Sequence, residues 1–147
     1  MRREFVYPVV LTPDEEAGGF VVSFPDLPEA ITQGEDEQDA LEQAADALDE
    51  ALAGRIRRGD DVPRPSRRRR GQRSVIPTPL MASKAALYLC LRESGLSRSD
   101  LARMLTCDGR EVRRLLDPRH PSKLPRLARA LAVLGGRLEL MLVEDVA

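Results

Sequence analysis

The chain has 147 residues, of which 32% are charged and 3% aromatic, and its 23 basic and 24 acidic side chains leave a formal net charge of −1. The two cysteines, Cys90 and Cys107, and the single histidine, His120, lack the spacing of metal ligands, so we expect no metal and no other cofactor. No apolar run approaches the ~20 residues of a membrane-spanning helix, and the first residues lack the apolar segment of a secretory signal. We therefore expect a cytoplasmic protein.

The charges are divided unevenly along the chain. Residues 1–62 carry 16 acidic and 5 basic side chains, a net charge of −11, whereas residues 63–147 carry 8 acidic and 18 basic ones, a net charge of +10. The near-zero total therefore hides two surfaces of opposite sign. This division predicts a polyanion as partner of the basic half and a basic partner for the acidic half.

The first third of the chain has the pattern of a β-meander. Phe5–Leu11 is β-branched and aromatic, as in a strand, and Pro8 cannot donate a ladder hydrogen bond, so we expect it to face outward on an edge or to mark an irregularity. The following predicted elements are a turn at Pro13–Gly19 and strands at Phe20–Phe24 and Ala30–Gln33.

A long helix is predicted after the meander. Asp36 is a suitable N-cap with Asp39 at the third helical position, and Gly59 ends the helix. The apolar positions recur at spacings of three and four residues: Leu41, Ala45, Leu48, Leu52 and Ile56. The opposite, acidic face fits an ordinary solvated surface and a partner-binding surface equally well.

An arginine-rich stretch separates this helix from the rest of the chain. Ser74–Pro77 could be a fourth strand that returns to the sheet, which places Arg67–Arg70 in a surface loop and the domain boundary near residue 79. Divided there, residues 1–79 carry −5 and residues 80–147 carry +4. For the arginine run we prefer a solvated loop over phosphate binding.

The second part begins with helices that carry capping signals. Ser83–Ser94 is predicted to be a helix with Leu87, Cys90 and Leu91 inward, ended by Gly95. Ser97 and Asp100 have the spacing of a capping box at the start of the next helix. A second capping box is expected at Asp108, which precedes Glu111 by three residues.

Two short helices joined at Thr106–Cys107 match a helix-turn-helix, in which the small Ala102 allows close approach. Burial of Val112, Leu115 and Leu116 leaves three arginines of the second helix free for guanine edges or phosphates, and Arg98 is placed to hold phosphate. The alternative is a solvated helical hairpin without a ligand. The capping pattern and the arginines favour DNA; the predicted DNA-binding residues are Arg98, Arg110, Arg113 and Arg114.

The last part of the chain predicts a further helix and a strand. Leu124–Leu134 is amphipathic and closed by Gly135, and Leu138–Val143 alternates as in a short terminal strand. Because a lone strand lacks a partner, we expect it to pair with the same strand of a second subunit in a homodimer, and the sequence leaves open whether dimers pair further into a tetramer. The alternative is an apolar tail that packs on its own domain.

At this point the residues resemble the HicB antitoxin family. The segments that carry the resemblance are Tyr7–Leu11, Gly19–Pro28, Thr32–Gly34 and the Ala-Leu-rich helix, with Ser97–Asp117 similar to the helix-turn-helix variant of the family. The resemblance spans nearly the whole chain except the arginine-rich loop. It implies an α+β fold: a β-β-β-α-β degraded ribonuclease H-like domain at 1–79 and a helix-turn-helix domain at 80–147. Two positions depart from the family pattern and concern base readout. Thr106 stands where many such turns have glycine, and Gly109 occupies an early recognition-helix position that often carries a base-reading side chain.

The resemblance also implies a function. Family members bind HicA, a small basic toxin that cleaves messenger RNA, and their back domain binds the operator as double-stranded DNA, which agrees with the charge division. We expect toxin contact at Asp26, Leu27 and Pro28, in a loop taken to be rigid and exposed. We expect no enzyme activity, although a residual nuclease using Asp14 and Asp26 remains an alternative. A stand-alone transcription regulator with a ligand-sensing or oligomerising front domain is the other alternative.

Overall fold

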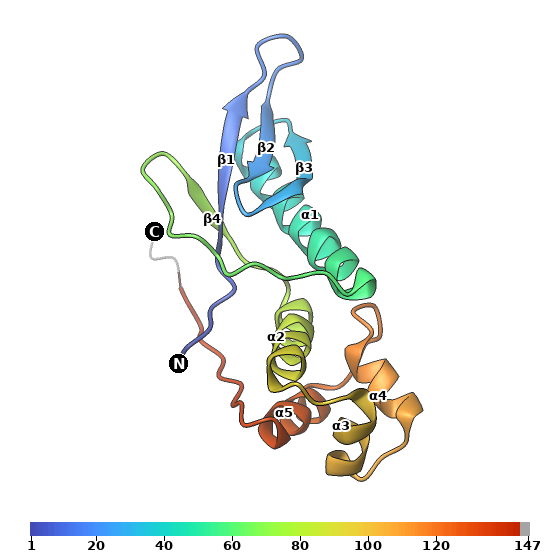
Figure 1. The fold of residues 1–147 in the computed structure, drawn as a ribbon. Helices are drawn as coiled ribbons and strands as arrows, with labels where there is room; N and C mark the ends of the chain where they lie inside the picture. Colours follow the sequence, from blue (N-terminus) through green and yellow to red (C-terminus); the bar gives the residue numbers. More distant parts are fainter. Residues whose placement is uncertain (145–147) are drawn as a thin grey trace.

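The protein folds into a four-stranded sheet with one long helix, followed by a group of shorter helices (Figure 1). The computed structural model describes residues 1–144. The α+β class is confirmed. The elements in chain order are β1 (Tyr7–Pro13), β2 (Phe20–Phe24), β3 (Leu27–Gly34), α1 (Glu37–Arg58), β4 (Arg73–Val75), α2 (Pro79–Ser94), α3 (Arg98–Leu105), α4 (Gly109–Leu116) and α5 (Leu124–Val133).

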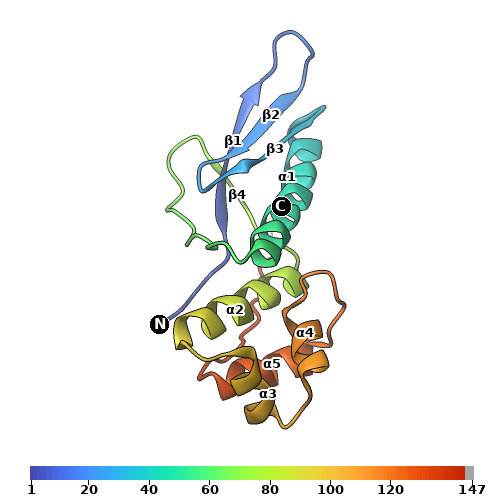
Figure 2. The same cartoon turned by 45° about the vertical axis from the view of Figure 1, so that its right-hand side comes forward.

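The sheet is antiparallel with the order β3-β2-β1-β4, so β1 is an inner strand (Figure 2). The prediction that Pro8 faces outward is wrong, because its ring is buried. Its position is nevertheless a local edge: β4 pairs with Tyr7–Val9, whereas the pairing with β2 begins only at Val10. At Pro8, β1 thus has one unpaired side, on which a missing N–H breaks no ladder.

Glycines bring β2, β3 and α1 into close contact. A Cβ atom on Gly34 would lie 2.3 Å from the backbone nitrogen of Ala40 in the first turn of α1. Gly19 has a φ of +72°, and a Cβ atom there would lie 2.2 Å from the carbonyl oxygen of Gly34. Gly19 and Gly34, which belong to the segments that carry the family resemblance, therefore have a packing role.

The predicted cap of α1 is confirmed, because the Asp36 carboxylate accepts a hydrogen bond from the Asp39 backbone N–H at 2.8 Å. The predicted apolar stripe is correct only in its second half. Leu48, Leu52 and Ile56 are buried, but Leu41 and Ala45 are half-buried. The close approach of β3 turns small residues toward the sheet, and the additional buried positions are Ala40, Ala44, Ala51, Ala53 and Gly54.

Helix α2 belongs to two hydrophobic cores. Met81, Ala85 and Leu89 pack with the sheet and α1, while Leu87 and Leu91 pack with α3, α4 and α5. The helix begins at Pro79 rather than at Ser83, because Thr78 caps it and proline suits its first turn. The boundary expected near residue 79 falls at the start of this helix.

Polar contacts join the α1 region to the helical group. The Asp49 carboxylate of α1 accepts hydrogen bonds from the Thr78 backbone N–H at 2.9 Å and hydroxyl at 2.7 Å. Arg119, which follows α4, forms an ion pair with Glu50 at 2.8 Å. The Tyr88 hydroxyl donates to the carbonyl oxygen of Asp60 at 2.6 Å. The helical group is thus attached to α1 at both ends of α2.

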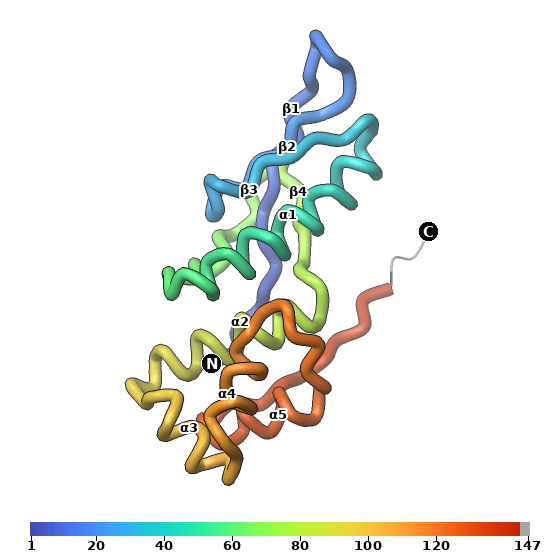
Figure 3. Tube along the Cα trace, turned by 90° about the vertical axis from the view of Figure 1, so that its right-hand side faces the viewer, coloured from blue at the N-terminus to red at the C-terminus, as the bar shows by residue number. Residues whose placement is uncertain are grey.

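The segment 137–144 belongs to no helix or strand of the single chain and leaves α5 as an extended stretch (Figure 3). Leu138 packs on the second core. The side chains of Leu140–Val143 are 70–83% exposed, so they do not pack on their own domain as the alternative required. Pairing with a second subunit stays a prediction. Within residues 1–144, no helix combines the length and the apolar character needed to cross a membrane.

Candidate nucleic-acid interface

Helices α3 and α4 begin at well-formed caps. The Ser97 hydroxyl accepts from the Asp100 N–H at 3.0 Å, and the Asp100 carboxylate accepts from the Ser97 N–H at 2.8 Å, which confirms the capping box. The hydrogen bond from Ser97 lowers the pKa of Asp100. At α4 only one of the two hydrogen bonds of a capping box forms. Asp108 accepts from the Glu111 N–H at 2.9 Å, but the Glu111 side chain pairs with Arg126 at 3.4 Å instead.

The connection between these helices is left-handed at Thr106, which has φ 53° and ψ 47°. It is the one non-glycine residue with a positive φ in the described part of the chain. The Cys107 N–H closes the turn by donating to the carbonyl oxygen of Ala102 at 3.0 Å. The turn thus has the geometry that glycine favours, although a β-branched residue occupies it.

Helix α4 buries one face and exposes its arginines. Val112 and Leu115 are 0% and 2% exposed, and Leu116 also lies in the core, as predicted. The four predicted DNA-binding arginines are all exposed, and none of them forms an ion pair within residues 1–144: Arg98, Arg110, Arg113 and Arg114. Figure 2 shows α3 and α4 at the end of the molecule away from the sheet. This face is therefore open to a polyanion.

A buried lysine that the sequence analysis missed holds the end of α4. Lys84 of α2 is 1% exposed, and its Nζ donates to the carbonyl oxygens of Arg114 at 2.8 Å and Leu115 at 2.9 Å, and to Ser122 Oγ at 2.7 Å. Burial lowers the pKa of Lys84 to about 8, against the opposing charges of Asp117 and Glu111. The ammonium thus caps the negative end of the α4 dipole.

The burial of Lys84 could have been predicted from its spacing to the buried leucines of α2. It precedes Leu87 by three residues and Leu91 by seven, so it lies on the same inward stripe of α2. His120, expected on the surface, is half-buried, and its Nδ1 lies 3.0 Å from the same Ser122 hydroxyl. The loop after α4 is therefore tied to α2 through Ser122.

The segment Asp26–Pro28 is not the exposed loop that was predicted. Leu27 is fully buried in the core at the start of β3. The Asp26 carboxylate accepts from the Ser66 backbone N–H at 2.8 Å and binds the Ser66 hydroxyl. Only Pro28 is exposed. Leu27 is thus unavailable to a partner; it pairs with Phe24 beside the register shift between Ser23 and Phe24 in the β2–β3 pairing.

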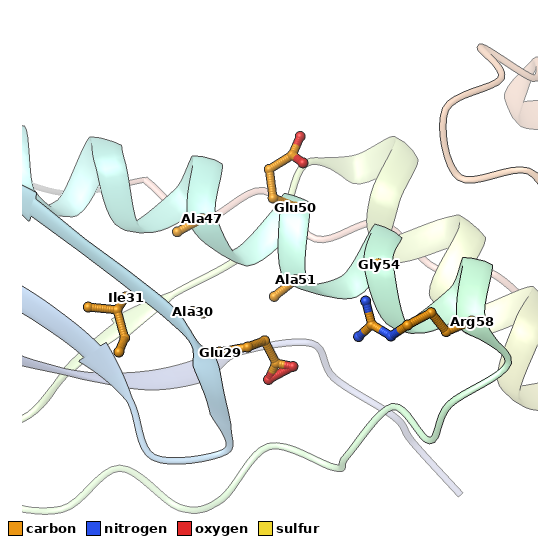
Figure 4. Close-up of a pocket in the computed structure, with 8 residues that line it drawn as sticks. All are labelled: Glu29, Ala30, Ile31, Ala47, Glu50, Ala51, Gly54 and Arg58. Atoms are coloured by element: carbon orange, nitrogen blue, oxygen red, sulfur yellow. The ribbon is translucent and has the colours of Figure 1, made fainter.

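A shallow groove of about 290 Å³ lies between β3 and α1 (Figure 4). Ala47, Ala51 and Gly54 of α1 contribute small side chains or none, and Ile31 of β3 is 65% exposed at its rim. Strand β3 is an outer strand of the sheet, so its edge is open. The groove thus offers apolar surface beside an unpaired strand.

Charged groups surround this groove. Arg55 binds both oxygens of Glu29, with Nε–Oε2 at 2.8 Å and Nη2–Oε1 at 2.9 Å, and this contact lowers the pKa of Glu29. Glu50 and Arg58 also line the groove. The acidic face of α1 continues from here toward its N-terminus, where Glu42 and Asp46 are exposed.

The acids considered for a nuclease have local structural roles. Asp14 accepts from the backbone N–H groups of Glu16 and Ala17, each at 3.1 Å, in the β1–β2 turn, whereas Asp26 holds Ser66. In the described residues, no three carboxylate, histidine or cysteine side chains gather as metal ligands.

Comparison with known proteins identifies relatives along the whole fold. Residues 6–86 match the family described as HicB-like antitoxin of bacterial toxin–antitoxin system. The chain is 38% identical over 135 residues to antitoxin HicB 1 of Photorhabdus laumondii, which covers 91% of this chain and 84% of the relative. It is 38% identical over 138 residues to antitoxin HicB of Escherichia coli K12, covering 93% and 99%, and 33% identical over 139 residues to that of Pseudomonas fluorescens, covering 94% and 95%.

Proposed function

Because the chain belongs to the HicB-like antitoxin family of bacterial toxin–antitoxin systems, we propose that it neutralises a small HicA-type, mRNA-cleaving toxin by covering its active site. We propose further that it represses its own operon by binding operator DNA through the helix-turn-helix. The observation that carries the second part is the exposed arginine face of α4. The groove between β3 and α1 supports the first part.

The DNA-binding proposal rests on a rigid helix with free charges. The Asp108 cap and the Lys84 contact fix the two ends of α4, while Arg110, Arg113 and Arg114 are exposed and without ion pairs in the described chain. Arginine side chains grip guanine edges or phosphates without losing existing partners. Arg98, exposed at the start of α3, is placed to hold phosphate as α3 crosses the DNA backbone.

The toxin-binding proposal now centres on the β3–α1 groove. Residues 1–62 carry a net charge of −11, which suits a basic partner. Ile31 offers an apolar anchor, and Pro28 lies three residues before it on the same strand. Asp26 and Leu27 have roles inside the fold, so we no longer include them in the proposed toxin contact.

The exposed residues 140–143 support a homodimer. Four consecutive apolar side chains that are 70–83% exposed are costly in water, and an extended segment pairs readily with a copy of itself. A two-fold dimer would present two α4 helices to half-sites about one helical turn, ~34 Å, apart.

The experiment combines growth with operator binding. Expression of the small protein encoded beside this gene should arrest growth, and this chain should relieve the arrest and co-purify with it. Arg110→Ala, Arg113→Ala and Arg114→Ala together should abolish operator binding while the rescue persists. The matched control replaces three other exposed arginines: Arg2, Arg57 and Arg137.

The toxin surface is tested with two exposed isoleucines. Ile31→Asp should weaken toxin binding about 30-fold or more, as expected for a central contact, and leave operator binding intact. Ile76→Asp is the control, because Ile76 is 62% exposed and lies outside the groove. Arrest without rescue, or equal losses in the two variants, would contradict the proposed toxin site and favour a stand-alone regulator.

A further inference from the structure

The segment between α1 and β4 carries a run of positive charge that the proposed function does not use. Arg67, Arg68, Arg69 and Arg70 follow one another, and we call them the arginine turn. All four are exposed. Figures 1 and 2 place this segment beside the sheet, away from α3 and α4. The arginine turn is thus separate from the helix-turn-helix.

The residues before the arginine turn are attached firmly to the sheet. Val62 is 2% exposed, and the hydroxyl of the buried Tyr7 donates to the carbonyl oxygen of Pro63 at 2.8 Å. Asp26 then accepts two hydrogen bonds from Ser66, the residue directly before the first arginine. The arginine turn therefore starts from a fixed point of the fold.

Backbone groups and one glutamine shape the turn itself. The Arg69 N–H donates to Gln72 Oε1 at 2.9 Å, and the Gln72 N–H donates to the Arg69 carbonyl oxygen at 3.1 Å. Gly71 provides the positive φ of 85°. Of the four guanidinium groups, Arg68 makes one backbone contact, to the Gln72 carbonyl oxygen at 3.2 Å. The turn would keep its shape without the other three charges.

The arginine turn also has no acidic partner. Within residues 1–144, none of its four side chains forms an ion pair, whereas the neighbouring Arg73 binds Glu37. Four adjacent cations repel one another, and no ion pair among the described residues offsets that repulsion. A ligand with closely spaced negative charges would offset it, and guanidinium groups match phosphates with paired hydrogen bonds.

We propose that the arginine turn is a second nucleic-acid site, which holds the phosphodiester backbone without reading bases and independently of α4. The ligand is a polynucleotide, either a DNA duplex or an RNA strand. This site goes beyond the proposed operator recognition, because it requires no operator sequence.

The test replaces the four arginines of the turn by serine in the full-length chain. Binding to a DNA duplex without operator sequence and to a single-stranded RNA is followed by fluorescence anisotropy through a salt titration. We expect the affinity for at least one ligand to fall about tenfold or more at 0.1 M salt. For the duplex, the slope of log affinity against log salt should fall by about 2 to 4. The ligand that shows the loss identifies the source of the phosphates.

A charge-matched control separates a local site from a change in overall charge. It replaces four exposed arginines elsewhere by serine: Arg2, Arg57, Arg58 and Arg137. This control should keep most of the affinity. The serine variant should also show its loss when combined with the α4 arginine-to-alanine changes. The ligands lack the operator, so this result is independent of whether operator recognition exists.

Three results would overturn the proposal. The first is unchanged affinity and salt slope for both ligands in the serine variant. The second is an equal loss in the charge-matched control. The third is a serine variant whose molar mass in light scattering falls while nucleic-acid binding is unchanged, which would assign the arginine turn to the acidic surface of a second copy of this chain.

Discussion

Replacing Lys84 by methionine keeps an unbranched side chain as far as the ε-carbon and removes the ammonium group. The carbonyl oxygens of Arg114 and Leu115 then lose a charged donor in a buried site. The Leu115 carbonyl oxygen is then a buried acceptor without its donor, which costs about 1–3 kcal/mol, whereas the Arg114 carbonyl oxygen keeps hydrogen bonds from the Asp117 N–H and the Ser122 hydroxyl, each at 3.3 Å. We therefore expect a loss of about 2 kcal/mol, which for a chain of this size corresponds to a fall of about 6 °C in the melting temperature.

The ionisation of Lys84 adds a pH dependence with a defined sign. Its pKa is about 8 in the folded protein, against an ordinary value of 10.5 for lysine. Between these values the unfolded chain binds the proton more tightly, so the free energy of unfolding rises with pH in that window. The full shift corresponds to about 3 kcal/mol. The stability difference between the parent chain and Lys84→Met should therefore increase from pH 7.5 to pH 10.5, because methionine does not titrate.

The chain provides its own control, since its two lysines are Lys84 and Lys123. Lys123 is exposed and makes no side-chain cap to α5, so Lys123→Met should change the stability by less than about 0.5 kcal/mol. Urea unfolding followed by circular dichroism measures both variants, and Nζ resonances of ¹⁵N-lysine report the pKa directly. Equal stability of the two variants, or a Lys84 pKa near 10.5, would refute this reasoning.

The remaining predictions concern glycine packing, the turn between α3 and α4, and the C-terminal segment. Gly34→Ala should cost more than about 3 kcal/mol of stability in thermal unfolding, because its Cβ would clash with backbone, whereas Gly109→Ala, with nothing within 4 Å, should be neutral or stabilising. Thr106→Gly should raise the stability by about 0.5–1 kcal/mol by relieving the left-handed conformation; a loss of stability in urea unfolding would contradict this. A chain that ends at Arg137 should be a monomer in light scattering. If the shortened chain is still a dimer, the terminal segment is not the dimer contact.

Local signals in the sequence predicted much of the fold. The caps at Asp36, Ser97 and Asp108 were identified correctly, because a capping side chain bonds a backbone group three residues away. The exposed arginines of α4 followed from the spacing of its buried residues, since helical periodicity alone decides which face is free. Contact between these arginines and DNA stays a prediction.

Contacts between distant segments could not be predicted in this way. The burial of Leu27 depends on the irregularity in the β2–β3 pairing, and the role of Asp26 depends on Ser66, 40 residues later. The rotated stripe of α1 follows from the approach of Gly34 to its first turn. Lys84 shares the inward stripe of α2, but its three acceptors come from residues 114–122, which no local pattern connects to it.

The two cores that meet on α2 restrict how the helical group could be exchanged between such proteins. A crossover near residue 79 would bring a foreign helix whose residues at positions 81, 85 and 89 had not evolved to pack on this sheet. The Asp49–Thr78 contact would also have to be matched across the junction. A viable recombinant must therefore inherit a whole α2 that fits two separate cores, so the exposed residues of α4 can change more readily than the helical group can be replaced.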